Sequence, residues 1–456
     1  MAVDRSHLPD VGPDPSFAFP SIVHHTLANG LRVRAVEHHS VPIITLALQL
    51  DGGSGGDTPG REGLAALVAD MVDEGTGSLN AIDVSDALAR IGGDYDIDVG
   101  PDATTFSLTT LTRFAERGAS LLAAMVTTPA LRDADFERVK RLRLDRLRQL
   151  KDSPPALAER AFLRLMYGSH PYGHLPIGAD ETLRRLTPAD VATLHRDRFG
   201  PAAATMVVAG AMAAADLIAL VDRAFGQWSA ASDGSPETPA SALTSFPMPP
   251  RLALVARDAA AQSELRIGHL SARRDTPDYP ALLVMNAVLG GQFVSRINLK
   301  LREEKGYTYG ARTGFDWHKG LSPFALQASV HTVSTVDAIR DALAELEGIR
   351  GNRPPTPQEL GLAKASLTRG YPRNFETAQQ VARAVTQLAL HDLPDTYFAE
   401  FVPKVHAVTA DALVAAAHTY LDPSRLTTLI VGDYAAIRDT LPSLNLGEPE
   451  LLPIDV

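Results

Sequence analysis

The sequence predicts an α+β protein made of two homologous halves, each an α/β-sandwich-like unit in which helices pack on a mostly antiparallel sheet. Three observations support this prediction. A set of landmarks recurs at a constant offset of 222 residues, a proline-containing linker at 229–250 separates the two copies, and strand-like segments precede helical ones in each copy. We therefore expect the halves to pack as a pseudo-symmetric pair with a cleft between their inner faces.

The recurring landmarks belong to a helix and to the strand that follows it. In both copies 14 residues separate the residue that opens the helix from the proline before the strand, and 9 residues separate that proline from a glycine at the strand's end. A strand-entry motif shared by two unrelated domains is the alternative explanation. The landmarks are Thr187, Pro201 and Gly210 in the first copy, and Thr409, Pro423 and Gly432 in the second.

Local patterns place the elements of the first half. We expect residues 1–20 to form an extended, proline-containing arm. Two β-rich segments, 31–36 and 42–50, are separated by a short turn and predict an antiparallel hairpin. A glycine-rich loop follows at 51–60. Further strands are expected at 94–99, 104–111 and 203–208, and helices at 62–74, 81–91, 114–126, 133–150 and 188–198.

Composition excludes several classes of function. A net charge of −11 without a basic stripe, apart from the helix at 140–151, argues against a nucleic-acid partner. No apolar run approaches the ~18 residues of a membrane span. The absence of cysteine removes disulfides, thiol nucleophiles and thiolate metal sites. Because the N-terminus has no apolar signal-peptide core, we expect a cytoplasmic location for the sequence as it stands, or a periplasmic one if a signal peptide has been removed.

The segment 289–310, LGGQFVSRINLKLREEKGYTYG, places two polar side chains across a predicted change of secondary structure. Gly306 is positioned to end a helix, and Tyr307 begins a strand. This reversal can bring the guanidinium of Arg302 near the phenol of Tyr309, where both can bind a peptide carbonyl. A charged LREEKG segment is also typical of the solvated last turn of any helix. The apolar positions of this helix are Phe293, Ile297 and Leu301.

Other histidines and loops do not form convincing metal, nucleotide or catalytic sites. The histidine pairs at 24–25 and 38–39 lie on extended or turn segments, where neighbouring side chains point apart. His170 and His174 lie in a loop rich in proline and glycine and are expected to be structural. The loop at 52–56 lacks the Gly-Lys-Ser/Thr ending of a phosphate loop, and the spacing of Ser, His and Asp residues defines no catalytic triad.

Four motifs in this order make the chain resemble the M16 family of peptidases (pitrilysin, insulinase and mitochondrial processing peptidase). They are TLANGLRV at 26–33, VPIITLALQLDGGSGGDTPGREGLAALVADMVDEGT at 41–76, SHPYGHLPIG at 169–178 and LREEKGYTYG at 301–310. Together with the duplication, the resemblance covers nearly the whole chain. It implies that the chain forms half of a clam-shell, with an N-terminal-type domain at 21–228 and a C-terminal-type domain at 251–456.

The resemblance also implies that the family's zinc motif is degenerate here. Active members carry H-x-x-E-H on a helix, in which two histidines bind zinc and the glutamate activates water. These positions fall on Ala66, Ala69 and Asp70, and the third ligand, a glutamate on a later helix, falls near Arg146. Alanine offers no lone pair and arginine repels a divalent cation, so we expect no metal or other cofactor in this chain.

Arg302 and Tyr309 match, in residue type and spacing, a pair that the family's C-terminal half directs at bound substrate. In the two-chain bacterial branch, one subunit carries the zinc and the other carries this pair. The resemblance therefore implies the non-metal subunit of a heterodimeric zinc metallopeptidase, inactive alone and acting on peptides or small unfolded proteins. Its expected partner is a homologous subunit with an intact H-x-x-E-H motif, which would hold the zinc.

Three alternatives remain. The α subunit of the mitochondrial processing peptidase also lacks zinc ligands, but it has a long glycine-rich loop where this chain has only Gly290-Gly291-Gln292-Phe293, for which a structural turn is the simpler interpretation. A non-enzymatic scaffold or peptide-binding subunit of a larger complex is the second alternative. The third is an independent hydrolase with unrecognised catalytic residues.

Overall fold

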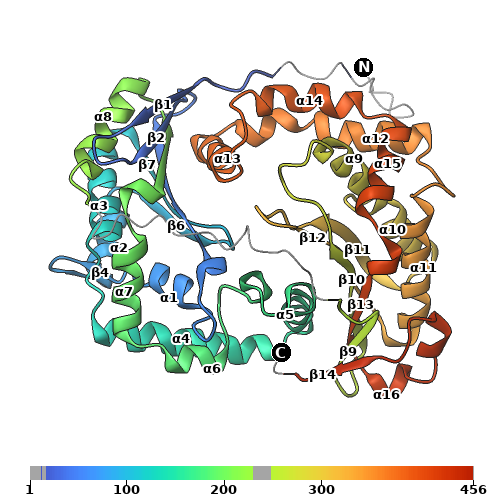
Figure 1. Cartoon of the computed structure of the whole chain (residues 1–456). Coiled ribbons are helices and arrows are strands. Elements are labelled where there is room, and N and C mark those ends of the chain that lie inside the picture. Colours follow the sequence, from blue (N-terminus) through green and yellow to red (C-terminus); the bar gives the residue numbers. More distant parts are fainter. Residues whose placement is uncertain (1–11, 13–16, 230–247, 455–456) are drawn as a thin grey trace, which may run out of the picture.

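Two six-stranded sheets, each packed with helices, form two halves that face each other (Figure 1). The structure, a computed structural model, describes residue 12 and residues 17–229 and 248–454. The expected α+β class is confirmed. Most of the predicted linker and most of the predicted N-terminal arm lie outside the described residues.

The strands of the first sheet all come from the first half of the chain. In spatial order they are β1 (Ile22–Thr26), β2 (Arg32–Glu37), β8 (Ala204–Gly210), β3 (Ile43–Asp51), β7 (Ala103–Leu111) and β6 (Asp94–Val99). Neighbouring strands run antiparallel except β2 and β8, which run parallel. A separate two-stranded ribbon contains β4 (Gly75–Thr76) and β5 (Leu79–Asn80).

The second sheet repeats this arrangement. In the matching spatial order its strands are β14 (Glu450–Leu452), β9 (Leu252–Ala256), β13 (Thr427–Gly432), β10 (Gln262–Leu270), β12 (Pro323–His331) and β11 (Thr308–Phe315). β9 and β13 run parallel as β2 and β8 do, and the next pairs are antiparallel in both sheets. The edges differ, because β14 runs parallel to β9 whereas β1 runs antiparallel to β2. A repeated strand order is the result expected of a duplicated chain.

Helices fill the intervals between the strands in both halves. Those of the first half are α1 (Leu64–Asp70), α2 (Ala81–Arg90), α3 (Ala115–Thr127), α4 (Asp133–Lys151), α5 (Pro154–Tyr167), α6 (Asp180–Arg185), α7 (Pro188–Arg198) and α8 (Ala214–Phe225). Those of the second half are α9 (Tyr279–Leu289), α10 (Arg296–Asn298), α11 (Thr335–Gly348), α12 (Pro357–Thr368), α13 (Ala378–Leu390), α14 (Tyr397–Ala407), α15 (Ala410–Tyr420) and α16 (Tyr434–Ile437). Among the described helices, none is both long and apolar enough to cross a membrane.

The repeated landmarks have equivalent structural roles in the two halves. Thr187 and Thr409 cap α7 and α15, because each side-chain oxygen accepts a backbone N–H of the first turn. Gly210 and Gly432 end β8 and β13. A Cβ atom on Gly210 would lie 2.7 Å from a backbone carbonyl oxygen of β3, and one on Gly432 would lie 2.6 Å from a side-chain oxygen of β10. Only glycine allows the neighbouring strand to approach this closely.

The predicted hairpin of 31–36 with 42–50 is wrong. Both segments are strands, β2 and β3, but β8 lies between them and pairs with each. All seven residues of β8 are buried. A strand without an exposed residue gains most from a central position, where neighbours cover both edges and both faces. This gain outweighs the local pairing that a short turn favours.

Each half contributes one helix to the other half's sheet. α5 packs against β10 and β13, and α13 packs against β3 and β8; both helices lie between the two sheets in Figure 1. Val207 of β8 belongs to the same buried cluster as Val385 of α13, and Phe162 of α5 to the same cluster as Val431 of β13. The halves therefore cannot separate without exposing apolar surface.

A polar contact also joins the halves at the turn between β11 and β12. The buried carboxylate of Asp102 accepts a hydrogen bond from the phenol of Tyr172 and another, 2.9 Å long, from the backbone N–H of Lys319. The phenol of Tyr167 donates to the carbonyl oxygen of Leu321 at 2.7 Å. Because a buried carboxylate is costly without hydrogen-bond partners, these contacts hold the turn against the first half.

The described end of the N-terminal arm packs on the second half. The Phe17 ring stacks on Phe375 with the ring centroids 4.8 Å apart, and the Phe19 ring lies 4.9 Å from that of Phe398. Both arm residues are half-buried. The arm thus adds an aromatic contact between the start of the chain and its second half.

Replacing both rings of the arm, Phe17→Ala with Phe19→Ala, is expected to lower the free energy of unfolding by about 1–2 kcal/mol per ring. This is less than the ~3–5 kcal/mol of a fully buried phenylalanine, because both rings are half-buried. Urea unfolding followed by circular dichroism measures the change. Val333→Ala, at a side chain that is 94% exposed, is the control. A double variant as stable as the wild type would contradict a stabilising role for the arm.

Candidate functional site

The helix on which the sequence places three of the degenerate motif positions, α1, begins at a constrained loop. Gly63 has a φ of +96°, and a Cβ atom there would lie 2.8 Å from the Cα of Gly178. The Asp57 carboxylate accepts hydrogen bonds from the backbone N–H groups of Gly63 and Ala65, both at 2.8 Å. It thereby satisfies N–H groups that have no partner inside the helix. The left-handed backbone of Gly63 explains why the helix predicted from residue 62 starts only at Leu64.

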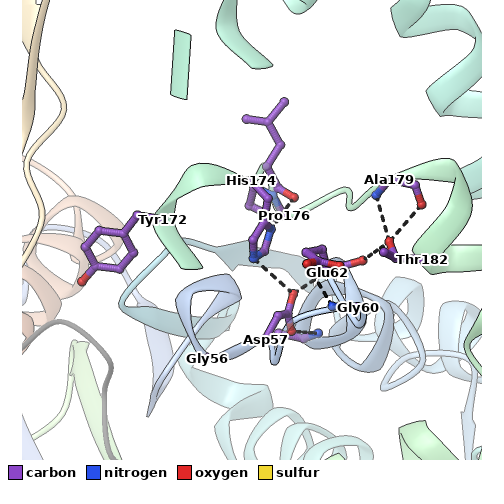
Figure 2. A network of polar contacts seen from close by, with 12 residues as sticks. Gly56, Asp57, Gly60, Glu62, Tyr172, His174, Pro176, Ala179 and Thr182 are labelled. Carbon is purple, nitrogen blue, oxygen red and sulfur yellow. Dashed lines mark hydrogen bonds and ion pairs between the residues drawn. The ribbon is translucent and has the colours of Figure 1, made fainter. Parts of the chain in front are cut away.

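Asp57 belongs to a wider polar network that holds the loop before α1 (Figure 2). His174 Nε2 lies 4.0 Å from the Asp57 carboxylate, and the hydroxyl of Thr182 donates to the backbone carbonyl of Glu62 at 2.8 Å. Burial raises the pKa of Asp57 to about 6, although the N–H of Ala65 and the field of His174 act in the opposite direction. These contacts favour the structural role expected of His174.

The four zinc-motif positions lie on α1 and α4, but their side chains do not fit a zinc ion. Ala66 and Ala69 are buried and have no ligating atom. Asp70 pairs with the guanidinium of Arg143, and Arg146 lines the same cavity of about 400 Å³ as Asp70. The positive charge of Arg146 repels a divalent metal ion, and the Asp70 carboxylate is already paired with Arg143. Within the described residues, no group of three or more His, Asp or Glu side chains is placed to hold a metal ion.

Sequence reasoning missed Arg143, although a signal for it was present. Arg143 and Arg146 are three residues apart on α4 and so lie on one face of that helix. Arg143 also donates to the carbonyl oxygen of Pro176 at 2.8 Å. It therefore connects α4 both to α1 and to the loop that follows α5.

Carboxylates at the end of α1 and in the following turn face these arginines. Asp73 and Glu74 line the cavity together with Asp70. Glu74 pairs with Arg138 of α4. Burial, reinforced by the charge of Glu74, raises the pKa of Asp73 to about 6. The cavity at the degenerate motif therefore carries charges of both signs.

The helix that carries Arg302 differs from the regular helix predicted for this segment. It starts at Arg296, after Phe293, and widens into a π-helical turn, η6 (Leu299–Glu304). Ile297 and Leu301 are fully buried as expected, whereas Phe293 is 62% exposed. The guanidinium carbon of Arg302 lies 4.3 Å from the centre of the Phe293 ring. Phe293 therefore supports the arginine by a cation–π contact instead of packing in the core.

The chain reverses where the sequence predicts it. Gly306 has a φ of +64°, and the N–H of Tyr307 bonds to the carbonyl oxygen of Leu301 at 2.8 Å. Because η6 packs against β11, Arg302 and Tyr309 lie on adjoining elements. Within the described residues, no hydrogen bond involves the phenol of Tyr309, whose side chain is 86% exposed.

Tyr309 lies in a β-bulge that the sequence did not indicate. Thr308 and Ala311, three residues apart, pair with residues of β12 that are only two apart. Tyr309 and Gly310 together therefore oppose a single residue. A bulge of this kind redirects a side chain at the edge of a sheet, and here it accompanies the exposure of the phenol.

A cavity of about 520 Å³ opens beside this segment, between residues 290–293, the strands β10 and β12, and the part of β11 that follows Tyr309. The carbonyl oxygen of Gly290 accepts a hydrogen bond from the N–H of Thr313 at 3.1 Å. A Cβ atom on Gly290 would lie 2.5 Å from Thr313 Oγ1. These contacts favour the interpretation of Gly290 as a structural turn.

Two family models match the chain. The model described as insulinase (peptidase family M16) matches residues 32–178, and the one described as the peptidase M16 inactive domain matches residues 185–367. A relative named as an uncharacterised zinc protease in Mycobacterium tuberculosis is 25% identical over 345 residues, which is 76% of this chain and 78% of the relative. One with the same description in Mycobacterium leprae is 25% identical over 423 residues, 91% of this chain and 93% of the relative.

Solved structures share the fold. A protease from Helicobacter pylori has a TM-score of 0.84 at 20% identity and covers 90% of this chain and 99% of its own. A peptidase M16 inactive domain from Pseudomonas fluorescens has a TM-score of 0.81 at 22% identity, with 90% and 98% covered. The two family models match successive parts of the chain and together cover more than half of it. The chain therefore belongs to the M16 peptidase family.

Proposed function

We propose that this chain is the zinc-free subunit of a two-chain M16 peptidase. It supplies Arg302 and Tyr309 to peptide cleavage, while a homologous partner with an intact H-x-x-E-H motif supplies the zinc. The substrates are peptides or small unfolded proteins enclosed between the two subunits.

The contrast between the two halves of the chain supports this proposal most directly. In the first half, the motif positions Ala66, Ala69 and Asp70 do not fit a metal, and Arg146 adds a positive charge to the same cavity. In the second half, the phenol of Tyr309 is exposed and has no hydrogen bond to other described residues. A hydroxyl without a hydrogen-bond partner, on an irregular segment, is suited to donate a hydrogen bond to a bound peptide.

The two side chains have complementary chemistry toward a peptide bond. The guanidinium of Arg302 can donate a charge-assisted hydrogen bond to the oxygen of a substrate carbonyl. Its contact with the Phe293 ring limits the rotamers it samples and so reduces the entropy lost on binding. The Tyr309 O–H can donate to the negative oxygen that develops as the carbonyl carbon becomes tetrahedral. Both roles require Arg302 and Tyr309 to lie beside the substrate carbonyl. Neither role requires a metal ion in this chain.

The first prediction from this proposal concerns the isolated chain. Dialysed against a zinc-containing buffer, it is expected to retain no stoichiometric zinc by mass spectrometry and to leave an internally quenched peptide uncut. Adding a homologous subunit with an intact motif should restore cleavage. Cleavage by the chain alone would contradict the proposal, and assembly with such a partner without any cleavage would favour the scaffold alternative.

Tyr309→Phe removes only the donor O–H and is expected to lower kcat of the reconstituted pair by a factor of about 10²–10³. Assembly, measured by analytical ultracentrifugation, should be unchanged because the exposed phenol makes no contact that holds the fold. Tyr434→Phe, on the distant helix α16, is the matched control. Equal turnover in the wild type and Tyr309→Phe would rule out the proposed donor role.

The carboxylate of Asp73 gives a pH prediction for the cavity at the degenerate motif. Its folded pKa is raised from 3.8 to about 6, so its contribution to stability is full below about pH 4 and is lost as the pH rises through 6. The asparagine of the variant Asp73→Asn is uncharged at both pH 4 and pH 8. The variant is expected to match the wild type near pH 4 and to be more stable by about 1 kcal/mol at pH 8, a value reduced for partial solvent screening.

Urea unfolding at the two pH values measures this difference. Asp439→Asn, at a side chain that is 91% exposed, is the control and should change stability little at either pH. A destabilised Asp73→Asn at pH 8 would show that the carboxylate makes a favourable contact in its charged form, contrary to the burial argument.

A further inference from the structure

We propose that the cavity beside Arg302 and Tyr309 is a subsite for an acidic side chain of the bound peptide, and that Arg312 is the residue that recognises its carboxylate. The inference rests on the proposed function, since it assumes that a peptide approaches Tyr309. It specifies which peptides the subunit prefers.

The cavity lies next to the reacting position. Its lining includes Gly310 and Arg312, which follow Tyr309 on β11, and Phe293, on which Arg302 stacks. A peptide whose carbonyl reaches Tyr309 therefore has a neighbouring side chain at the mouth of this cavity. With a volume of about 520 Å³, the cavity is large enough for a glutamate or aspartate side chain.

The floor of the cavity is a buried ion pair that is already balanced. Glu264 accepts hydrogen bonds from Arg266 Nη1 at 2.7 Å and from the hydroxyl of Ser329, so both of its oxygens are occupied. Glu264 and Arg266 are 7% and 3% exposed. A basic substrate side chain would have to break this buried pair to reach Glu264, which is costly.

Arg266 also keeps one donor without a hydrogen bond. Its Nη groups donate to Glu264, Leu265 and Pro155, but its buried Nε has no hydrogen bond and lies 3.6 Å from the nearest Glu159 oxygen. A buried guanidinium N–H without an acceptor favours a ligand that brings one. An acceptor group that reaches this Nε would satisfy its N–H, whereas another donor would not.

Arg312 is a cationic group of the cavity that makes no ion pair with a described carboxylate. Its Nε and Nη2 donate to Gln327 Oε1 at 3.2 and 2.9 Å, and among the described residues it makes no salt bridge. Gln327 is a neutral acceptor, so the full charge of the guanidinium remains available. Arg266 pairs with Glu264, and Arg312 is the one further charged side chain among the residues that line the cavity.

Several backbone N–H groups around the cavity are not available to hydrogen-bond a peptide. The N–H groups of Ala311 and Thr313 on the free side of β11 are bonded to Asn298 Oδ1 at 3.0 Å and to the Gly290 carbonyl at 3.1 Å. The start of α5, which also borders the cavity, has no N–H group at Pro154 or Pro155. We therefore assign recognition of the carboxylate to a side chain, Arg312.

The test uses the purified full chain and short unstructured peptides that differ only at one central residue, Glu, Gln or Lys. Fluorescence anisotropy of labelled peptides gives the dissociation constants. The Glu peptide is expected to bind about tenfold more tightly than the Gln peptide, as a charge-assisted contact predicts, and the Lys peptide should bind more weakly still. Arg312→Gln should abolish the difference between Glu and Gln peptides, and Arg312→Glu should reverse the preference to Lys.

Arg90→Gln, on α2 in the first half, is the control and should keep the wild-type preference. Equal affinity for the Glu and Gln peptides, no binding of any of them, or an Arg312→Gln variant that loses affinity for both equally would overturn the inference. A purely structural arginine would give the last of these results.

The same peptides as substrates of the reconstituted pair separate this inference from the proposed function. Glu-selective binding by the chain, with no cleavage by the pair, would leave the subsite intact and refute the function. Cleavage of the Glu and Gln peptides with equal kcat/KM would leave the function intact and refute the subsite.

Discussion

The exchange of one helix between the halves is the constraint on which the rest of the structure depends. α5 of the first half covers β10 and β13, and α13 of the second half covers β3 and β8. A sheet needs both faces buried or solvated by suitable side chains, and β8 has no exposed residue at all. Neither half therefore completes its core alone. The contacts of Asp102 with the turn between β11 and β12 add a polar link to this apolar one.

Contacts within the first half explain how α1 keeps its place without a metal ion. Leu67 and Val68 of α1 are fully buried in the core of the first half. The Asp57 carboxylate satisfies the N–H groups at the start of the helix, and ion pairs with α4 hold its end. Packing, a cap and charge pairs thus provide the stability that a metal provides in structural zinc sites.

The second half is irregular where its candidate groups lie. A π-helical turn carries Arg302, and a bulge carries Tyr309. Both features interrupt regular hydrogen bonding, and both are frequent at functional sites. Gly306, with its left-handed backbone, joins the two elements. The result is a half-buried guanidinium and an exposed phenol on adjoining elements, with Phe293 beside the guanidinium and a cavity that Arg312 also lines.

Features that depend on neighbours in the sequence were predictable from it. The caps at Thr187 and Thr409, the helix end at Gly306 and the repeated spacing each follow from local rules of turn, cap and helix formation. The sequence also determined that Ala66 and Ala69 have no ligating atoms, since that is a property of the residues themselves. The position near Arg146, inferred by counting, lies at the same cavity as Asp70.

Only the tertiary structure decided which distant segments meet. In the folded chain β8 lies between β2 and β3, and Asp70 pairs with Arg143. Phe293 remains exposed and contacts Arg302. Strand order depends on the free energy of burying segments that are far apart in the chain, and a local pattern does not contain that term. The bulge at Tyr309 arises in the same way, because the register of β11 is set by its partner strand β12 and by α10, whose Asn298 bonds to the free edge of β11.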